Sequence, residues 1–347
     1  MTISTLIVGG LFNTAYSETF SEAFAKAKAS GLAEFTYNGN SYSTQTAEEA
    51  ANLSYGPFPV TVKAYSGSKT NSVSYTGQIA RHVLHDSLKK MSSKGNMDDM
   101  MVYYEGSDGD LSIIAPASKD GFPIKQKTLN EISKGKNLSG KTYKGIINAW
   151  PGQMTGPEVL EFMIEKAAGS KGGFDPSTGY NYTQLISKFA MGAVFYNQAV
   201  DNYLDEKLGA DNKPNNKPYK DGAHYTGKEH VWDEAFGYWG AAAHSLQLSA
   251  KENYNIAKMK NLTAADANGD GMVDLKSEYN FAHSYYASSF DKGGKTNYFE
   301  TVTKAFIDGR QIITNANGQK LTDSQREKLI NLAATIERNW EKVLAEA

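Results

Sequence analysis

A short segment near residue 270 has the residue types and spacing of a calcium-binding loop. Acidic and amide side chains at its first, third, fifth and ninth positions supply the oxygen ligands that Ca²⁺ prefers, and Gly271 at the sixth permits a sharp turn. The expected ligands, the seventh position using its backbone carbonyl, are Asp266, Asn268, Asp270, Met272, Asp274 and Glu278. The usual twelfth position is Ser277, so the closing carboxylate comes one residue late. The pattern predicts a structural Ca²⁺ site, and a turn-rich loop without an ion is the alternative.

A second set of chemistry-bearing side chains lies in the stretch EHVWDEAFGYWG. If this stretch is helical, His230, Asp233 and Glu234 fall on one face, because residues three and four apart are neighbours on a helix. An imidazole and two carboxylates on one face can bind iron or zinc when another helix completes the coordination. The alternative is a His–carboxylate pair buried between helices. Gly237 and Gly240 permit the close approach of a neighbouring backbone.

A third set, Gln78 and Arg81, lies one turn apart on another predicted helix. These two side chains are candidates to face His230 across a cleft, where they would bind a carboxylate or complete the metal site. A solvated helix face or an inter-helix ion pair is the alternative. No phosphate-binding glycine loop and no nucleophile motif is present, so the sequence favours binding over catalysis.

These candidates sit on elements that the hydrophobic periodicity predicts to be mainly helical. The expected helices are residues 17–29, 77–91, one from the Thr155 turn to Gly169, 182–204, 228–248, 298–307 and one opening at the Thr322 capping box. A hairpin is expected at residues 35–42 around an Asn-Gly turn. The stretch 103–144 is rich in Gly, Ser and Lys and is expected to be irregular. The predicted fold class is therefore mainly α.

The pattern also predicts two parts of unequal size. Residues 1–55 form a small helix-plus-hairpin module, and residues 56–347 form a helical domain. The helical domain leaves room for two related halves, 56–204 and 228–347.

The bulk composition excludes several classes of function. The 347 residues carry 36 basic and 38 acidic side chains, a net charge of −2, which argues against nucleic acid or an acidic membrane surface as a partner. Without cysteine there are no thiolate metal sites and no disulfides. The longest apolar run, residues 6–12, is far shorter than the roughly 20 residues that span a bilayer. It lacks the basic start of a signal peptide, so we expect a leader to have been removed or never to have been there.

Four segments resemble an uncharacterised-domain family of Gram-negative envelope proteins, many of them lipoproteins or periplasmic. They are Val73–Arg81, Met191–Ala199, His230–Tyr238 and Asp270–Asn280, and the resemblance extends from about residue 54 to the C-terminus. That family is in turn similar to the imelysin-like, iron-regulated proteins, which carry a GxHxxE motif on a helix. Here His230 and Asp233 occupy the HxxE places, with Asp for Glu and Lys228 for Gly.

The resemblance implies a pair of helical bundles with a polar cleft between them, a periplasmic or cell-surface location, and a role with iron or another metal but no settled catalytic activity. Together with the motifs, it predicts a non-catalytic metal or metal-complex binding protein of the cell envelope. The alternative is a calcium-stabilised interaction or structural protein, surface- or phage-associated, with no transition-metal role. Expected partners are a metal ion or metal complex and envelope proteins.

Overall fold

The computed structural model describes residues 18–30, 32, 34–43, 72–209 and 212–347. The chain divides into two compact units, Met1–Ala51 and Asn52–Ala347. The apolar run at residues 6–12 and the expected boundary at residue 55 lie outside the described residues. Within the described ranges, no helix has both the length and the apolar character needed to cross a membrane.

The first unit contains the predicted helix and hairpin. Helix α1 spans Phe20–Ala29, and strands β1 (Glu34–Tyr37) and β2 (Asn40–Ser43) pair antiparallel. The turn between the strands has φ of 50° at Asn38 and 82° at Gly39, the positive values that an Asn-Gly hairpin turn requires. The local sequence therefore predicted this part correctly.

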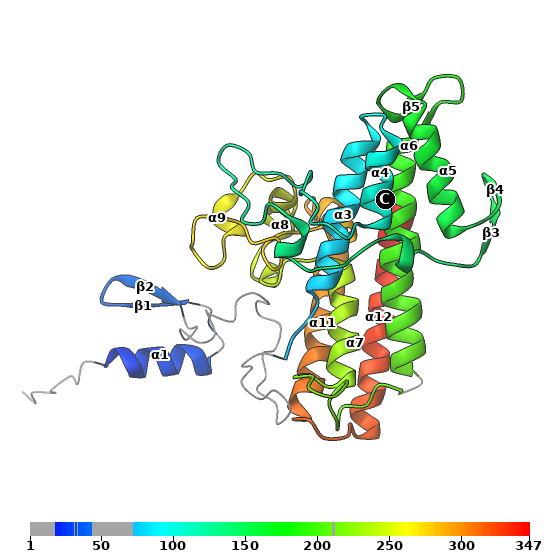
Figure 1. Cartoon of the computed structure of the whole chain (residues 1–347). Helices are drawn as coiled ribbons and strands as arrows, with labels where there is room; N and C mark the ends of the chain where they lie inside the picture. Colours follow the sequence, from blue (N-terminus) through cyan, green and yellow to red (C-terminus); the bar gives the residue numbers. More distant parts are fainter. Residues whose placement is uncertain (1–17, 31, 33, 44–71, 210–211) are drawn as a thin grey trace, which may run out of the picture. The chain divides into compact units, whose positions relative to one another are not determined.

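The second unit is mainly helical, as predicted, with two small hairpins inserted (Figure 1). Its α-helices are α3 (Thr76–Ser92), α4 (Met97–Glu105), α5 (Gly156–Ala168), α6 (Tyr182–Ala190), α7 (Gly227–Trp239), α8 (Ala250–Ala257), α9 (Leu262–Ala265), α10 (Ala282–Asp291), α11 (Tyr298–Asn315) and α12 (Asp323–Glu346). The hairpins pair β3 (Ile146–Ala149) with β4 (Gly152–Thr155), and β5 (Phe174–Asp175) with β6 (Tyr180–Asn181). Short 3₁₀ turns are η2 (Leu129–Glu131), η3 (Ser139–Lys141), η4 (Lys171–Gly173) and η6 (Ser245–Gln247).

Helix α6 runs without a break into a π-helical segment, η5 (Met191–Lys207). The buried side chains of η5 recur in pairs at intervals of five and four residues, wider than the 3.6 residues of an α-helical turn. These pairs are Val194 with Phe195, Ala199 with Val200, and Tyr203 with Leu204. The wider winding keeps all three pairs on one face, and it was not anticipated for residues 182–204.

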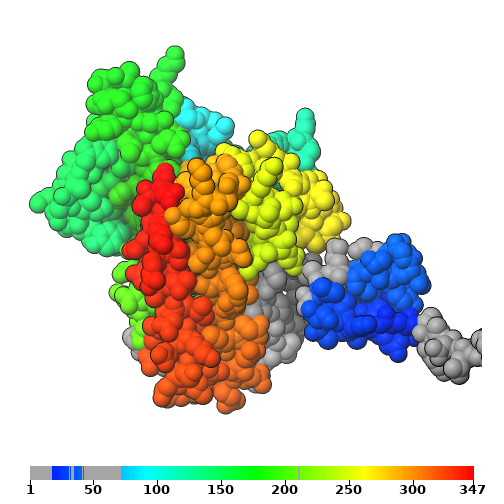
Figure 2. Space-filling view, turned by 180° about the vertical axis from the view of Figure 1, so that it is seen from behind, coloured from blue at the N-terminus to red at the C-terminus, as the bar shows by residue number. Residues whose placement is uncertain are grey.

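The long helices lie side by side around one hydrophobic core. Helix α7 packs against α3, η5 and α11, and α11 packs along α12. Figure 2 shows α11 (orange) and α12 (red) next to one another on one face of this unit. Trp232, Trp239 and Trp340 are fully buried, and a single core cluster extends from Val73 to Val343. The two expected halves, 56–204 and 228–347, thus contribute to one shared core.

Glycines set the spacing of α7 from its neighbours. A Cβ added at Gly237 would lie 2.7 Å from the Tyr75 Cβ and 2.8 Å from the Gln78 Cβ, so α3 can approach α7 only because this position is glycine. On another side of α7, a Cβ at Gly309 of α11 would lie 2.0 Å from the Trp232 ring. The expected close approach at Gly237 is therefore present.

Three predicted element bounds are wrong. The helix expected at 228–248 ends at Trp239, because Gly240 adopts a left-handed conformation with φ of 78° and caps it. His244 therefore lies on a turn rather than further along that helix. The helix expected at 298–307 continues to Asn315, and the irregular stretch expected from residue 103 begins only after α4 ends at Glu105.

Candidate functional site

A polar cavity of about 290 Å³ lies beside α3 and α7. Four of the side chains that line it are candidates from the sequence: Gln78, Arg81, His230 and Glu234. Gln78 and Arg81 come from the first two turns of α3, and His230 and Glu234 come from successive turns of α7. The close packing at Gly237 brings these two helices together, so residues about 150 positions apart in the sequence share one cavity.

Three lysines that the sequence did not single out complete the cavity. Lys136 and Lys141 project from the irregular segment between α4 and β3, and Lys207 lies at the end of η5. With Arg81 they make four cationic side chains around the cavity, against a single carboxylate, Glu234. Among the described residues, no carboxylate lies at ion-pairing distance from any of these four cations.

Burial and neighbouring charges together lower the pKa of the three cavity lysines. Burial lowers the pKa of Lys136, and the Arg81 guanidinium lowers it further. The same two causes lower the pKa of Lys141. Burial also lowers the pKa of Lys207, against the opposing effect of Glu234. The lysines are therefore less easily protonated than free lysines, which is the expected result when several cations share a partly dry space with only one carboxylate among the described lining residues.

Arg81 is held in place by backbone carbonyls rather than by an acid. Its Nε donates to the carbonyl of Asn137 at 3.0 Å, and its Nη1 donates to the carbonyl of Gly77 at 3.1 Å. These bonds orient the guanidinium without neutralising its charge. Because Asn137 belongs to the segment that carries the two cavity lysines, the first bond also ties that segment to α3.

His230 and Glu234 form the opposite wall. The His230 Nε2 lies 3.7 Å from a Glu234 carboxylate oxygen, and the imidazole ring packs against the rings of Tyr219 and Tyr225, with centroids 4.0 and 5.2 Å away. Burial lowers the pKa of His230, and Glu234 opposes that effect, so the ring is held neutral near pH 7. A neutral imidazole beside a carboxylate is the form that binds transition metals. Burial, with Glu234 nearby, raises the pKa of Tyr203 at the cavity wall.

Asp233 does not join His230 and Glu234. Its carboxylate turns away from the cavity, where Oδ1 accepts from the Arg310 Nε at 2.8 Å and Oδ2 accepts from the Ser74 backbone N–H at 3.2 Å. The expectation of one shared face is therefore wrong for Asp233. Helical spacing predicts only approximately where a side chain points around the helix axis. Here the Asp233 carboxylate points toward α11, where it accepts a hydrogen bond from the buried Arg310 guanidinium.

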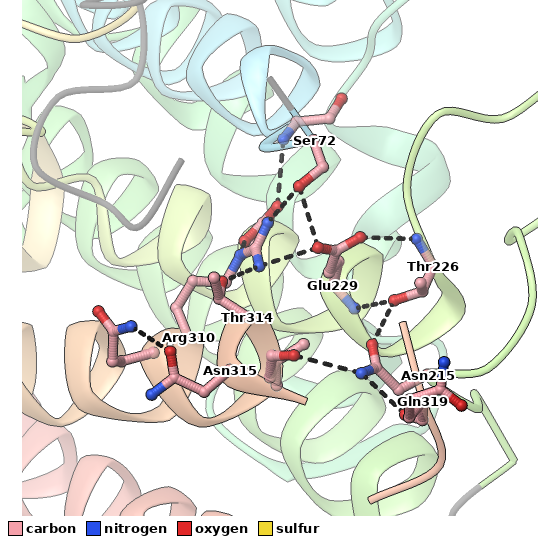
Figure 3. Close-up of polar contacts among 12 residues, drawn as sticks. Ser72, Asn215, Thr226, Glu229, Arg310, Thr314, Asn315 and Gln319 are labelled. Atoms are coloured by element: carbon pink, nitrogen blue, oxygen red, sulfur yellow. Dashed lines mark hydrogen bonds and ion pairs between the residues drawn. The ribbon is translucent and has the colours of Figure 1, made fainter. Parts of the chain in front are cut away.

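Figure 3 shows the buried polar network on that side of α7. Arg310 Nη1 donates to Glu229 Oε1 at 3.1 Å, and its Nη2 donates to the Ser72 hydroxyl at 2.9 Å. The second Glu229 oxygen accepts from the Thr226 backbone N–H at 2.9 Å, which closes the capping box at the start of α7. Arg310, Glu229 and Asp233 are all fully buried. Burial raises the pKa of Asp233 to about 7, with Arg310 opposing the shift and Glu229 adding to it.

The predicted calcium loop folds back on itself through its own side chains. Asp266 accepts from the backbone N–H of Asp270 at 3.0 Å and of Gly271 at 2.8 Å. Glu278, the displaced residue, reaches the start of the loop and accepts from the N–H of Asn268 at 3.3 Å. Burial raises the pKa of Glu278 to about 7.

The remaining loop candidates lie in the same turn. Asn268 accepts from the N–H of Asp270, Asp270 accepts from the N–H of Met272, and Asp274 accepts from the Gln126 side chain at 2.8 Å. Lys125 also lies 3.1 Å from Asp270. Across the described ranges, no three or more His, Asp or Glu side chains are placed so that they could hold a metal ion.

The fold and the cavity define a mainly helical protein with a polar cavity lined by four cationic side chains and Glu234. Residues 163–334 match the family model of DUF4856, a domain of unknown function, so the chain carries a domain of an uncharacterised family. No curated protein and no solved structure matches the chain. The matched region includes His230 and Glu234 but not Arg81 or the cavity residues Lys136 and Lys141.

The family match is shorter than the resemblance from residue 54 onward. It includes the segments Met191–Ala199, His230–Tyr238 and Asp270–Asn280, whereas Val73–Arg81 lies before it. The lysines of the cavity gave no signal in the sequence, because isolated lysines in an irregular segment are ordinary surface residues unless the fold turns them toward one another.

Proposed function

We propose that this protein is a non-catalytic binding protein that takes up a metal, such as iron or zinc, as an anionic complex in the cavity between α3 and α7. The observation that supports this proposal is the meeting of His230 and Glu234 with Arg81 in one cavity. The imidazole and carboxylate supply two metal ligands, and the cations attract the anionic groups of a chelator. A periplasmic or cell-surface location is part of the same proposal.

Calorimetric titration of the full chain tests it. Wild-type protein is titrated with ZnCl₂ and, separately, with ferric citrate. We expect His230→Ala to weaken binding of both at least tenfold, because one of only two protein ligands is lost. His224→Ala is the matched control, since His224 does not line the cavity. Identical isotherms for wild type and His230→Ala would refute the metal role.

A second function has its own supporting observation. The loop from Asp266 to Glu278 gathers acidic side chains around one turn, and Glu278 is held there with a raised pKa. A bound Ca²⁺ would be held by the oxygen atoms of these side chains and would fix the conformation of the loop. The protein would then be a calcium-stabilised interaction protein, with the separate unit Met1–Ala51 as its attachment module.

Two measurements separate this alternative from the first function. Ca²⁺ should raise the Tm of the full chain, and Asp266→Asn should remove that increase while leaving the ferric citrate isotherm unchanged. Asp308→Asn, at an exposed site on α11, is the control. A Tm that does not respond to Ca²⁺ would exclude the calcium staple.

A further inference from the structure

The cationic wall of the cavity is the feature that carries an additional inference. Arg81, Lys136, Lys141 and Lys207 come from three separate parts of the chain, namely α3, the segment before β3, and η5. Folding concentrates them in about 290 Å³ with one carboxylate. Folded proteins rarely leave several partly buried cations without counter-charges, because both desolvation and mutual repulsion destabilise such a group.

The first turn of α3 adds to this field. Gly77 and Gln78 line the cavity at the N-terminal end of a helix of 17 residues, where the helix dipole is positive. Burial lowers the pKa of Lys136 and Lys141, and the nearby Arg81 guanidinium lowers both further. Two properties, namely the side-chain charges and the helix end, thus favour a negatively charged occupant.

The number and placing of the cations define the class of that occupant. Four cations against one carboxylate leave a surplus of three positive charges, which a singly charged anion does not balance. Because the cations are distributed over three elements, they match several anionic groups better than a single tetrahedral oxyanion.

We propose that the occupant is a small chelating polycarboxylate, with two or three carboxylates on the cations and its metal turned toward His230 and Glu234. This inference rests on the function proposed above and names the chemical class of its ligand. One molecule then binds both sides of the cavity. Its carboxylates neutralise the lysines, and its metal is also coordinated by the His230 imidazole. Citrate is the probe for this class.

The test compares binding and stability in the same variants. Calorimetry measures the binding of citrate, ferric citrate and inorganic phosphate to the wild type and to the double variant Lys136→Met/Lys141→Met. Thermal unfolding measures the Tm of both proteins without ligand. We expect the double variant to bind citrate at least tenfold more weakly and yet to have a higher Tm, because two repelling, partly buried charges are gone. Lys342→Met, at an exposed position on α12, should change neither.

The outcomes are distinguishable. Phosphate binding as tight as citrate binding, or unchanged citrate binding in the double variant, would overturn the polycarboxylate assignment and leave ZnCl₂ binding at His230 intact. Citrate binding that does not strengthen with ferric iron and is insensitive to His230→Ala would refute the metal function instead. A lower Tm in the double variant would identify the lysines as structural and overturn the inference.

Discussion

Charged side chains are wholly or partly removed from water on both sides of α7, but they are paired with opposite charges on only one of them. On one side, Arg310 contacts both Glu229 and Asp233, and every charged group of that trio has an opposite charge at contact distance. On the other side, the cavity collects four cations around Glu234 and leaves them without ion pairs among the described residues. The first arrangement is neutralised within the fold, whereas the second keeps an excess of positive charge among the described lining residues.

The difference separates charges that hold the helices together from charges that are available to a ligand. Buried charges that neutralise one another fix the relative positions of helices and need no partner. Partly buried charges of one sign destabilise the protein that carries them, and they are retained where binding uses them. By this criterion Asp233, which the helical spacing placed with His230, belongs to the structural side.

The largest expected effect is on the neutralised side. Arg310→Met leaves Glu229 and Asp233 buried without a cation and should lower the free energy of unfolding by about 3–5 kcal/mol. Urea denaturation measures it. Lys304→Met on the same helix removes an exposed cation paired with Asp308 and should cost less than about 1 kcal/mol. Equal losses of stability in the two variants would contradict the structural role of the buried Arg310, Glu229 and Asp233 trio.

A backbone substitution tests whether the helix spacing creates the cavity. Gly237→Ala places a Cβ within 2.8 Å of atoms of Tyr75 and Gln78, so we expect a loss of about 1–3 kcal/mol and weaker ligand binding. Gly192→Ala, where nothing lies within 4 Å of the added Cβ, is the control and should be neutral or slightly stabilising. Full stability in Gly237→Ala would show that α3 and α7 are not closely packed here.

The pH dependence of the unfolding free energy should show the protonation of the buried Asp233 carboxyl group. Asp233 has a pKa of about 7 in the folded chain against 3.8 for a free side chain, so the folded state holds its proton more tightly than the unfolded state. Its contribution to stability is fully present below about pH 4 and is lost as pH rises through 7.

Asp233→Asn should therefore flatten the decline in unfolding free energy between about pH 4 and 7, by at most about 1.4 kcal/mol per pH unit. Urea titrations at several pH values measure the slope. Asp201→Asn, at an exposed site on η5, is the control. An unchanged slope in Asp233→Asn would mean that Arg310 keeps the acid ionised throughout.

The smallest expected effect is a change in binding that distinguishes the carboxylate part of the proposed ligand from its metal. Glu234→Gln removes the only carboxylate among the described residues that line the cavity, and so adds to the positive surplus. One charge contact in a partly exposed site contributes about 1 kcal/mol, so citrate should bind roughly fivefold more tightly. Zinc should bind more weakly, because a metal ligand is lost. If the affinities for citrate and for zinc changed in the same direction, the cavity would not have separate sides for the anion and the metal.

Local signals in the sequence predicted most of the helical fold. The capping boxes at Thr155 and Thr322, and the Gly169 cap at the end of α5, mark helix ends through contacts within a few residues. The same holds for the Asn-Gly hairpin turn. The helix prediction for 228–248 failed although a local signal was present. Gly240 is a helix C-cap, but the apolar residues after it were interpreted as a continuation of the helix.

The sequence by itself determined most of the long helices, the N-terminal hairpin and the residue types on each helix, because these depend on neighbours within one or two turns. Only the tertiary structure decided which charges meet. Gly237 and Gly309 allow α3 and α11 to approach α7, and that approach sends Asp233 to Arg310 and gathers Lys136 and Lys141 with Arg81. Such partners are 50 to 80 positions apart, and no periodicity links them.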